Sequence, residues 1–291
     1  MSAQFPPTPL RPATTTTAPT TTTATGQLAT TVSPWQSLVA AFAFGIVVNA
    51  ASGAAFMMIR GNGSTLFKDS LRLVLVVFLA AAALWAQIDF IATIIDPSRA
   101  ALSGCQIAVA AASAFDQISR VAILQYLLWA INSGMKMTVE AFVPQGLLLV
   151  RLIVGAVLVG MQRPQFNPTC VGTVQILPVA IITIALDFVL FLAAFVRATR
   201  TGLLKQMKAD SPRAETAKGI FWTMLGFAAW TGASVPMILG LARLQLILRT
   251  VVPAVALAVL IGKLLCPNQS PSFSPALLTR GQVSSPPLAE H

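Results

Sequence analysis

Charged side chains and histidine are scarce in this sequence. Asp, Glu, Lys and Arg together make up 10% of the 291 residues, whereas soluble domains contain about 25%. Hydrophobic residues make up 56%, and this balance excludes an ordinary soluble globular protein. The one histidine is His291, at the last position, and the chain has three cysteines. We therefore expect neither a zinc nor a haem site, and no cofactor.

Several catalytic signatures are also missing. The sequence has no Asp-rich DDxxD motif to hold magnesium diphosphate, which argues against an ionising prenyltransferase. It has no GxSxG elbow and no histidine-based dyad, which argues against a hydrolase. The last apolar segment carries its lysine, Lys263, at its end and not in its middle. That position argues against the retinal Schiff base of a microbial rhodopsin.

Long apolar segments fill most of the chain. About 20 apolar residues suffice to cross a bilayer as a helix, and seven segments approach or exceed this length. The sequence predicts an all-α, polytopic membrane protein whose residues 35–266 form a bundle of seven transmembrane helices. The expected spans are residues 35–59, 71–95, 101–132, 144–161, 173–196, 219–241 and 244–265.

The two ends of the chain have a different composition. Residues 1–34 are rich in Thr and Pro, and residues 267–291 are rich in Ser and Pro. Neither end can bury a hydrophobic core, so both are expected to be disordered tails. The Thr-rich tract is either an O-glycosylated stalk or an unmodified tail.

The net charge of +10 indicates membrane orientation rather than nucleic acid binding, because the cations lie between apolar segments. With the N-terminus outside or in the lumen, twelve of the nineteen Lys and Arg face the cytosol and five face outward. The positive-inside rule then places the C-terminus in the cytosol. The membrane that holds the protein is expected to be either the endoplasmic reticulum or the plasma membrane. Glycosylation sequons at Asn62 and Asn268 would face the cytosol, unused. The basic loop from Arg197 to Lys218 either contacts a cytosolic protein partner or reflects the positive-inside rule alone.

Four charged residues inside the predicted spans are placed to pair with one another. Asp116 and Arg120 are four residues apart, so they share one face of a helix. A charge at the centre of a span costs roughly 2.5–3.5 kcal/mol, so this face is expected to point into the bundle. Asp187 lies at a depth similar to that of Asp116, and Arg151 lies in the same half of the membrane as Arg120. We therefore expect one neutral network of Asp116, Arg120, Arg151 and Asp187 between helices.

Asp89 is a third intramembrane carboxylate, and two arginines cannot neutralise three. A carboxylate beside Arg stays charged, whereas a desolvated carboxylate outside such a pair favours its acid form. Only the acid form protonates a substrate. Asp89 is therefore the first candidate for a catalytic acid, and Asp187 is the second if both arginines turn to Asp116. The alternative is a structural network that holds the helices in register.

Two cysteines fall on the same side of the predicted membrane. Cys105 lies at the outer end of the third span, and Cys170 lies in the outer loop before the fifth. Both then face an oxidising compartment, where a disulfide would tie the loop to the helix. The alternative is two unpaired cysteines among apolar helices.

Short segments of the chain resemble fungal seven-helix integral membrane proteins that are encoded in secondary-metabolite gene clusters. The resemblance covers about residues 35–265 and is carried by Cys105, AFDQISR at 114–120, LLWA at 127–130 and ALDFV around Asp187. Some members of that group are metal-independent terpene cyclases, which protonate an epoxide or an alkene with an intramembrane carboxylic acid. Their acids lie partly in the sixth span, where this chain has none.

The resemblance implies a component of a biosynthetic pathway for terpenoid or related lipophilic compounds, with a lipophilic small molecule as substrate. Aromatic rings would then stabilise a carbocation, although at helical spacing they also suit packing. The candidates are Trp85, Phe90, Tyr126, Trp129, Trp222 and Trp230.

In topology the chain is also similar to fungal G-protein-coupled-receptor-like proteins. These share an outside N-terminus, a cysteine pair of this placement and a basic loop before the sixth span. This second resemblance implies a receptor or sensor, in which the charge network would act as a conformational lock.

Overall fold

The computed structural model describes residues 34–62, 69–94, 102–132, 142–166, 170–174, 177–203, 207, 212–239 and 247–265. The predicted tails lie outside these ranges, apart from Pro34, and so does the sequon at Asn268. The side chain of Asn62 and most of the basic loop between residues 204 and 211 also lie outside the described part.

Seven helices make up most of the described chain, so the predicted all-α class is confirmed. They are α1 (Pro34–Asn62), α2 (Ser70–Ile94), α3 (Leu102–Asn132), α4 (Phe142–Gly160), α5 (Leu177–Arg200), α7 (Pro212–Ile238) and α8 (Val252–Leu265). A five-residue π-helix, η2 (Ile247–Val251), leads directly into α8.

Five of these helices, α1 to α5, are long and apolar enough to cross a membrane. Helix α8 is apolar but shorter, and α7 is longer but carries Glu215 and Lys218 in its first two turns. The long apolar helices indicate a membrane-embedded, multi-pass protein. Seven helices are described, and five of them satisfy the length and composition of a span, so the predicted seven spans stay a prediction.

Proline explains where several helices begin. Helices α1 and α7 start at Pro34 and Pro212, and Pro178 is the second residue of α5. Proline suits the first helical turn because its missing N–H has no helical partner at that position. The predicted sixth span started at residue 219, but the helix begins at Pro212, so its first turns contain charges that the sequence placed in a loop.

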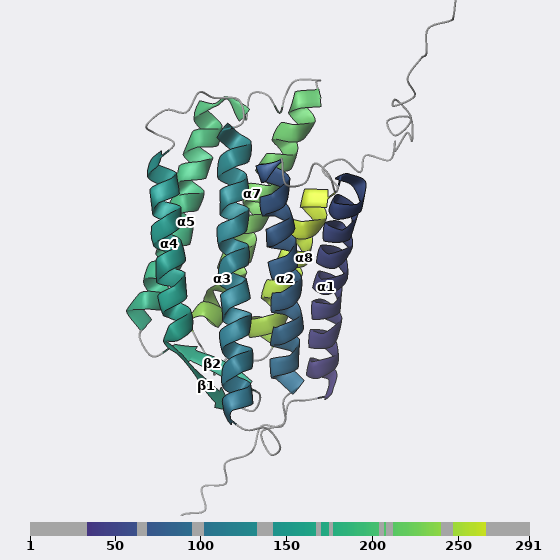
Figure 1. The fold of residues 1–291 in the computed structure, drawn as a ribbon, viewed down its shortest axis with the longest axis vertical. Helices are drawn as coiled ribbons and strands as arrows, with labels where there is room; N and C mark the ends of the chain where they lie inside the picture. The colour runs from purple at the N-terminus through teal and green to yellow at the C-terminus, as the bar shows by residue number, and fades with distance from the viewer. Residues whose placement is uncertain are drawn as a thin grey trace, which may run out of the picture. The chain divides into compact units, whose positions relative to one another are not determined.

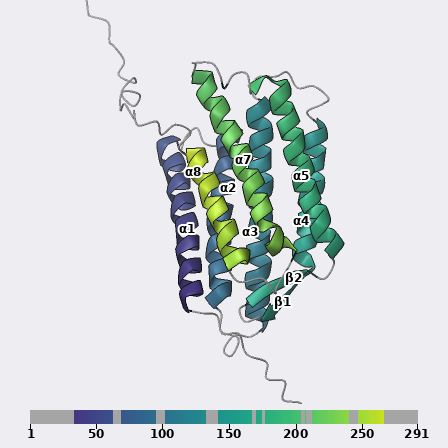
Figure 2. The ribbon, with the colours of Figure 1, turned by 180° about the vertical axis from the view of Figure 1, so that it is seen from behind.

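Helix α3 is the central element of the helical body. It contacts α2 and α4 along its length and also reaches α5, α7 and the segment between α4 and α5. On the other side, α2 packs on α1, and α8 packs between α7 and α1. Successive helices alternate in direction, so the start of α1 and the end of α8 lie at opposite ends of the bundle (Figures 1 and 2).

The segment between α4 and α5 forms a β-hairpin. The sequence had instead predicted a loop here, followed by a fifth span that begins at residue 173. Strands β1 (Gln162–Phe166) and β2 (Cys170–Val174) are antiparallel, with Phe166 opposite Cys170 and Gln162 opposite Val174. Because residues 170–174 are a strand, α5 begins at Leu177 and not at residue 173. The hairpin lies at the end of the bundle where α3 starts (Figure 1).

The helices bury several aromatic side chains between them and expose other large apolar side chains outward. Phe44 of α1 meets Trp85 of α2 edge to face, with ring centroids 5.8 Å apart, and Phe78 meets Trp230 of α7 at 6.5 Å. Large apolar side chains on the outside of α1, such as Phe42, are mostly exposed. A continuous exposed apolar surface of this kind suits contact with lipid.

Candidate functional site

Four buried charged residues from three helices form one ion cluster. Arg120 of α3 donates from Nε to Asp116 Oδ2 at 2.9 Å, within the same helix. Arg151 of α4 donates two hydrogen bonds to Asp187 of α5, from Nε to Oδ1 at 2.6 Å and from Nη2 to Oδ2 at 3.0 Å. Arg120 Nη1 lies 3.6 Å from Asp187 Oδ2 and joins the two pairs. The structure thus brings together all four residues that the sequence assigned to the network.

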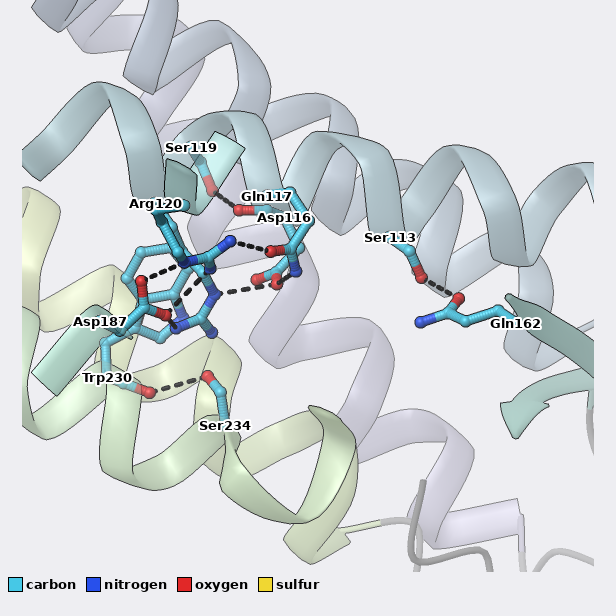
Figure 3. A network of polar contacts seen from close by, with 10 residues as sticks. Ser113, Asp116, Gln117, Ser119, Arg120, Gln162, Asp187, Trp230 and Ser234 are labelled. Atoms are coloured by element: carbon cyan, nitrogen blue, oxygen red, sulfur yellow. Dashed lines mark hydrogen bonds and ion pairs between the residues drawn. The ribbon is translucent and has the colours of Figure 1, made fainter. Parts of the chain in front are cut away.

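Two further residues complete the cluster. The Gln117 amide donates to Asp116 Oδ2 at 3.0 Å and accepts from Arg151 Nη1 at 2.7 Å, so it bridges α3 and α4 (Figure 3). The Arg120 guanidinium lies over the ring of Trp230, with Cζ 4.4 Å from the centroid, and this contact brings α7 into the cluster. The sequence analysis missed Gln117, although its place beside Asp116 in an apolar span was a signal.

Burying this cluster costs free energy, because its charged groups lose their contact with water. Arg120, Arg151 and Asp187 are 0% exposed, and Asp116 is 1% exposed. Two carboxylates and two guanidiniums cancel in charge, which is the condition for holding such groups away from water. Arg120 Nη2 has no hydrogen-bond partner in the described residues, so the π face of Trp230 provides its compensating contact.

A small polar cavity lies between this cluster and the hairpin. Its volume is about 40 Å³, and on this measure one water needs roughly 10–15 Å³. Its lining comes from seven elements: Asp89, Val109, Ala112, Ser113, Asp116, Gln117, Leu158, Gln162, Cys170, Gly172, Ile238 and Thr250. Ser113 of α3 donates to Gln162 of β1 on the hairpin side of the cluster (Figure 3). The cavity is therefore lined by carboxylates of α2 and α3 and by residues of the hairpin.

A disulfide fixes the hairpin to α3. Cys105 and Cys170 are bonded, with Cα atoms 5.6 Å apart, and both are buried. Cys105 is in the first turn of α3, and Cys170 is the first residue of β2 and also lines the cavity. The bond therefore holds one wall of the cavity in place.

The two candidate acids occupy different environments. Asp89 of α2 is half-buried and lines the cavity. Asp187 is absent from the lining and is held by Arg151 and Arg120. A proton on Asp187 would break its two-point contact with Arg151, so this residue is poorly placed to act as an acid.

The predicted aromatic candidates do not gather around the cavity, because none of the six is among the described residues that line it. Trp230 presents a ring face to Arg120, and Trp85 packs against Phe44. Trp222 is 44% exposed and lies beneath the Lys263 ammonium, 5.3 Å from the ring centroid. In this conformation the rings serve packing and ion binding.

Neither a known family model nor a curated protein sequence matches this chain.

A glycine allows α3 and α4 to approach each other at the cluster. A Cβ on Gly155 would meet Arg151 Nη1 at 2.8 Å and Gln117 Oε1 at 3.1 Å. We expect Gly155→Ala to destabilise the protein by about 1–3 kcal/mol, because the bridge between Gln117 and Arg151 has to move.

The matched control is Gly146→Ala on the same helix, where a Cβ meets nothing within 4 Å. That change is expected to be neutral or to stabilise by about 0.5–1 kcal/mol. Thermal unfolding in detergent compares the two, and equal melting temperatures would contradict the predicted close contact.

Proposed function

We propose that the protein is a membrane-embedded component of a biosynthetic pathway for a terpenoid or related lipophilic compound, with Asp89 as an intramembrane acid. The observation that supports this proposal is that Asp89 lines a polar cavity, while both buried arginines are engaged in the cluster beneath it. An acid used for catalysis needs access to its substrate. Asp89 and Asp116 both line the cavity, but Asp116 is paired with Arg120 in the cluster, whereas Asp89 lies on α2 and is not one of the four cluster residues.

The proposed reaction is an acid-initiated cyclisation. The Asp89 carboxylic acid gives its proton to an alkene or an epoxide, and the π electrons of a second double bond close the ring. The resulting cation loses a proton from a neighbouring carbon, which restores the acid. The product is an isomer of the substrate, so the reaction requires no redox partner and no metal.

The cavity has to enlarge for such a substrate, because 40 Å³ holds only a few waters. Two of its lining residues belong to irregular segments: Thr250 is in the π-helix η2, and Ile238 ends α7 two residues after Pro236. Proline and π-helical turns are common points of helix bending. We propose that these two segments move outward when a lipophilic molecule enters.

The proposed topology is seven spans with an outside or lumenal N-terminus and a cytosolic C-terminus, and its support is the lysine and arginine count together with the alternating helices. A tag fused after His291 is expected to be digested by protease added to intact right-side-out microsomes. A tag that becomes accessible only after detergent treatment would contradict this orientation.

Deletion of the gene in the host organism tests the biosynthetic function. We expect the final lipophilic product to be lost and an uncyclised precursor to accumulate, because the cyclisation step is missing. Metabolite profiling by mass spectrometry measures both compounds. An unaltered profile would contradict the proposal.

A receptor is the second candidate, and the disulfide-tied hairpin that lines the cavity is the observation that favours it. In this case the cluster that joins α3, α4, α5 and α7 would be the lock that a ligand releases. The same deletion distinguishes the two functions, because loss of a response to an external cue with an unchanged metabolite profile would support the receptor.

A further inference from the structure

The cavity has an oxygen atom that needs a partner. Asp116 is 1% exposed, and its Oδ2 accepts hydrogen bonds from Arg120 and Gln117. Its other oxygen, Oδ1, is buried and has no hydrogen-bond partner in the described residues. Because Asp116 also lines the cavity, the natural place for that partner is inside it. A buried carboxylate oxygen without a partner costs about 1–3 kcal/mol or more.

The rest of the polar lining consists mainly of oxygen-bearing groups. Ser113 is one helical turn before Asp116, so the two lie on the same face of α3. Thr250 of η2 adds a hydroxyl, and Asp89 of α2 adds a second carboxylate that has contacts of its own. Lys and Arg are absent from the described lining residues. Such a set attracts a positive charge, since carboxylate and hydroxyl oxygens are the usual ligands of hard cations.

The size and composition of the cavity favour a monovalent ion. A volume of about 40 Å³ accepts one small ion together with one or two waters. In the described ranges no three His, Cys, Asp or Glu side chains cluster as a metal site. A divalent ion in a protein cage generally requires more carboxylate ligands than Asp116 and Asp89 provide.

We propose that this cavity binds a small monovalent cation, with Asp116 Oδ1 as the principal ligand and the Ser113 hydroxyl as a second one. The ion couples the hairpin to the cluster, because Ser113 also donates to Gln162 of β1. This inference does not depend on the biosynthetic function, since it concerns the stability of the folded state and is measured without substrate.

The test measures the melting temperature of the full-length protein in neutral detergent. Sodium chloride, potassium chloride and N-methylglucamine chloride are compared at equal concentration, so that chloride and ionic strength stay constant. We expect sodium or potassium to raise the melting temperature by about 2–4 °C over N-methylglucamine, because a ligand of the folded state alone stabilises it.

Ser113→Ala removes one proposed ligand and leaves the ion cluster intact, so it is expected to reduce the salt-dependent shift by at least half. Asp116→Asn is expected to abolish the shift, and if this variant does not fold, Ser113→Ala still decides. Asp69→Asn is the control: Asp69 pairs with Arg72 outside the cavity, so the full shift is expected. Equal wild-type melting temperatures in the three salts would show that the cavity holds water only and would overturn the proposal. A full shift in Ser113→Ala would do the same.

Discussion

Arg120→Ala is expected to destabilise the protein by about 3–5 kcal/mol, the usual cost of breaking a buried ion pair by removing one partner. The change leaves Asp116 buried with only Gln117 as a hydrogen-bond donor, and Asp187 loses its contact at 3.6 Å. It also removes the guanidinium from the face of Trp230. All three lost contacts are buried, so bulk water does not compensate for the missing charge.

Thermal unfolding in detergent measures this effect, and Arg200→Ala is the matched control. Arg200 is exposed at the end of α5, so its loss is expected to change stability by about 0–1 kcal/mol. Arg120→Met separates charge from volume, because it fills most of the space without the charge. We expect it to be nearly as unstable as Arg120→Ala. An unchanged melting temperature in both variants would mean that the cluster contributes little to the folded state.

The main features of the cluster were predictable from the sequence for a simple reason. Asp116 and Arg120 are one helical turn apart, so they lie on the same face of the helix. A charged pair in an apolar span is expected to face the interior of the bundle rather than lipid. The depth of Asp187 and Arg151 followed from the helical rise. The pairing itself was not predictable, because the rotation of each helix decides which arginine meets Asp187.

The hairpin and the cavity were beyond prediction from local patterns. Residues 162–174 contain Pro164 and Gly172, which are unfavourable in strands, so the segment was expected to form a loop. The cavity draws lining residues from α2, α3, α4, both strands, α7 and η2. Such a site exists only after long-range packing, and the position of Asp89 relative to the hairpin is not encoded in any short segment.

The helix boundaries illustrate the same limit. Helix α7 begins at Pro212 rather than at residue 219, because charged residues are compatible with the exposed first turns of a helix. The last predicted span began at residue 244, whereas the described helical structure begins with the π-turn at Ile247. A π-turn has no reliable signature in sequence, yet it places Thr250 at the cavity.

Asp89→Asn is expected to have the second large effect, which is loss of the cyclised product without loss of folded protein. Asparagine has nearly the same shape as aspartate and cannot supply an acidic proton, so folding is expected to persist while cyclisation stops. Asp187→Asn is expected to behave differently, because it disrupts the pair with Arg151 and therefore lowers the amount of folded protein. Asp69→Asn is the matched control outside the cavity, with its carboxylate partly exposed beside Arg72.

The decisive measurement is the metabolite profile of a deletion strain that expresses Asp89→Asn at the level of the wild-type protein. We expect the uncyclised precursor to accumulate and the product to fall at least about a hundredfold, in line with the contribution of about 10²–10⁴ from a general acid. The strain with Asp69→Asn is expected to make the wild-type product. Wild-type product levels with Asp89→Asn would contradict the assignment of Asp89 as the acid.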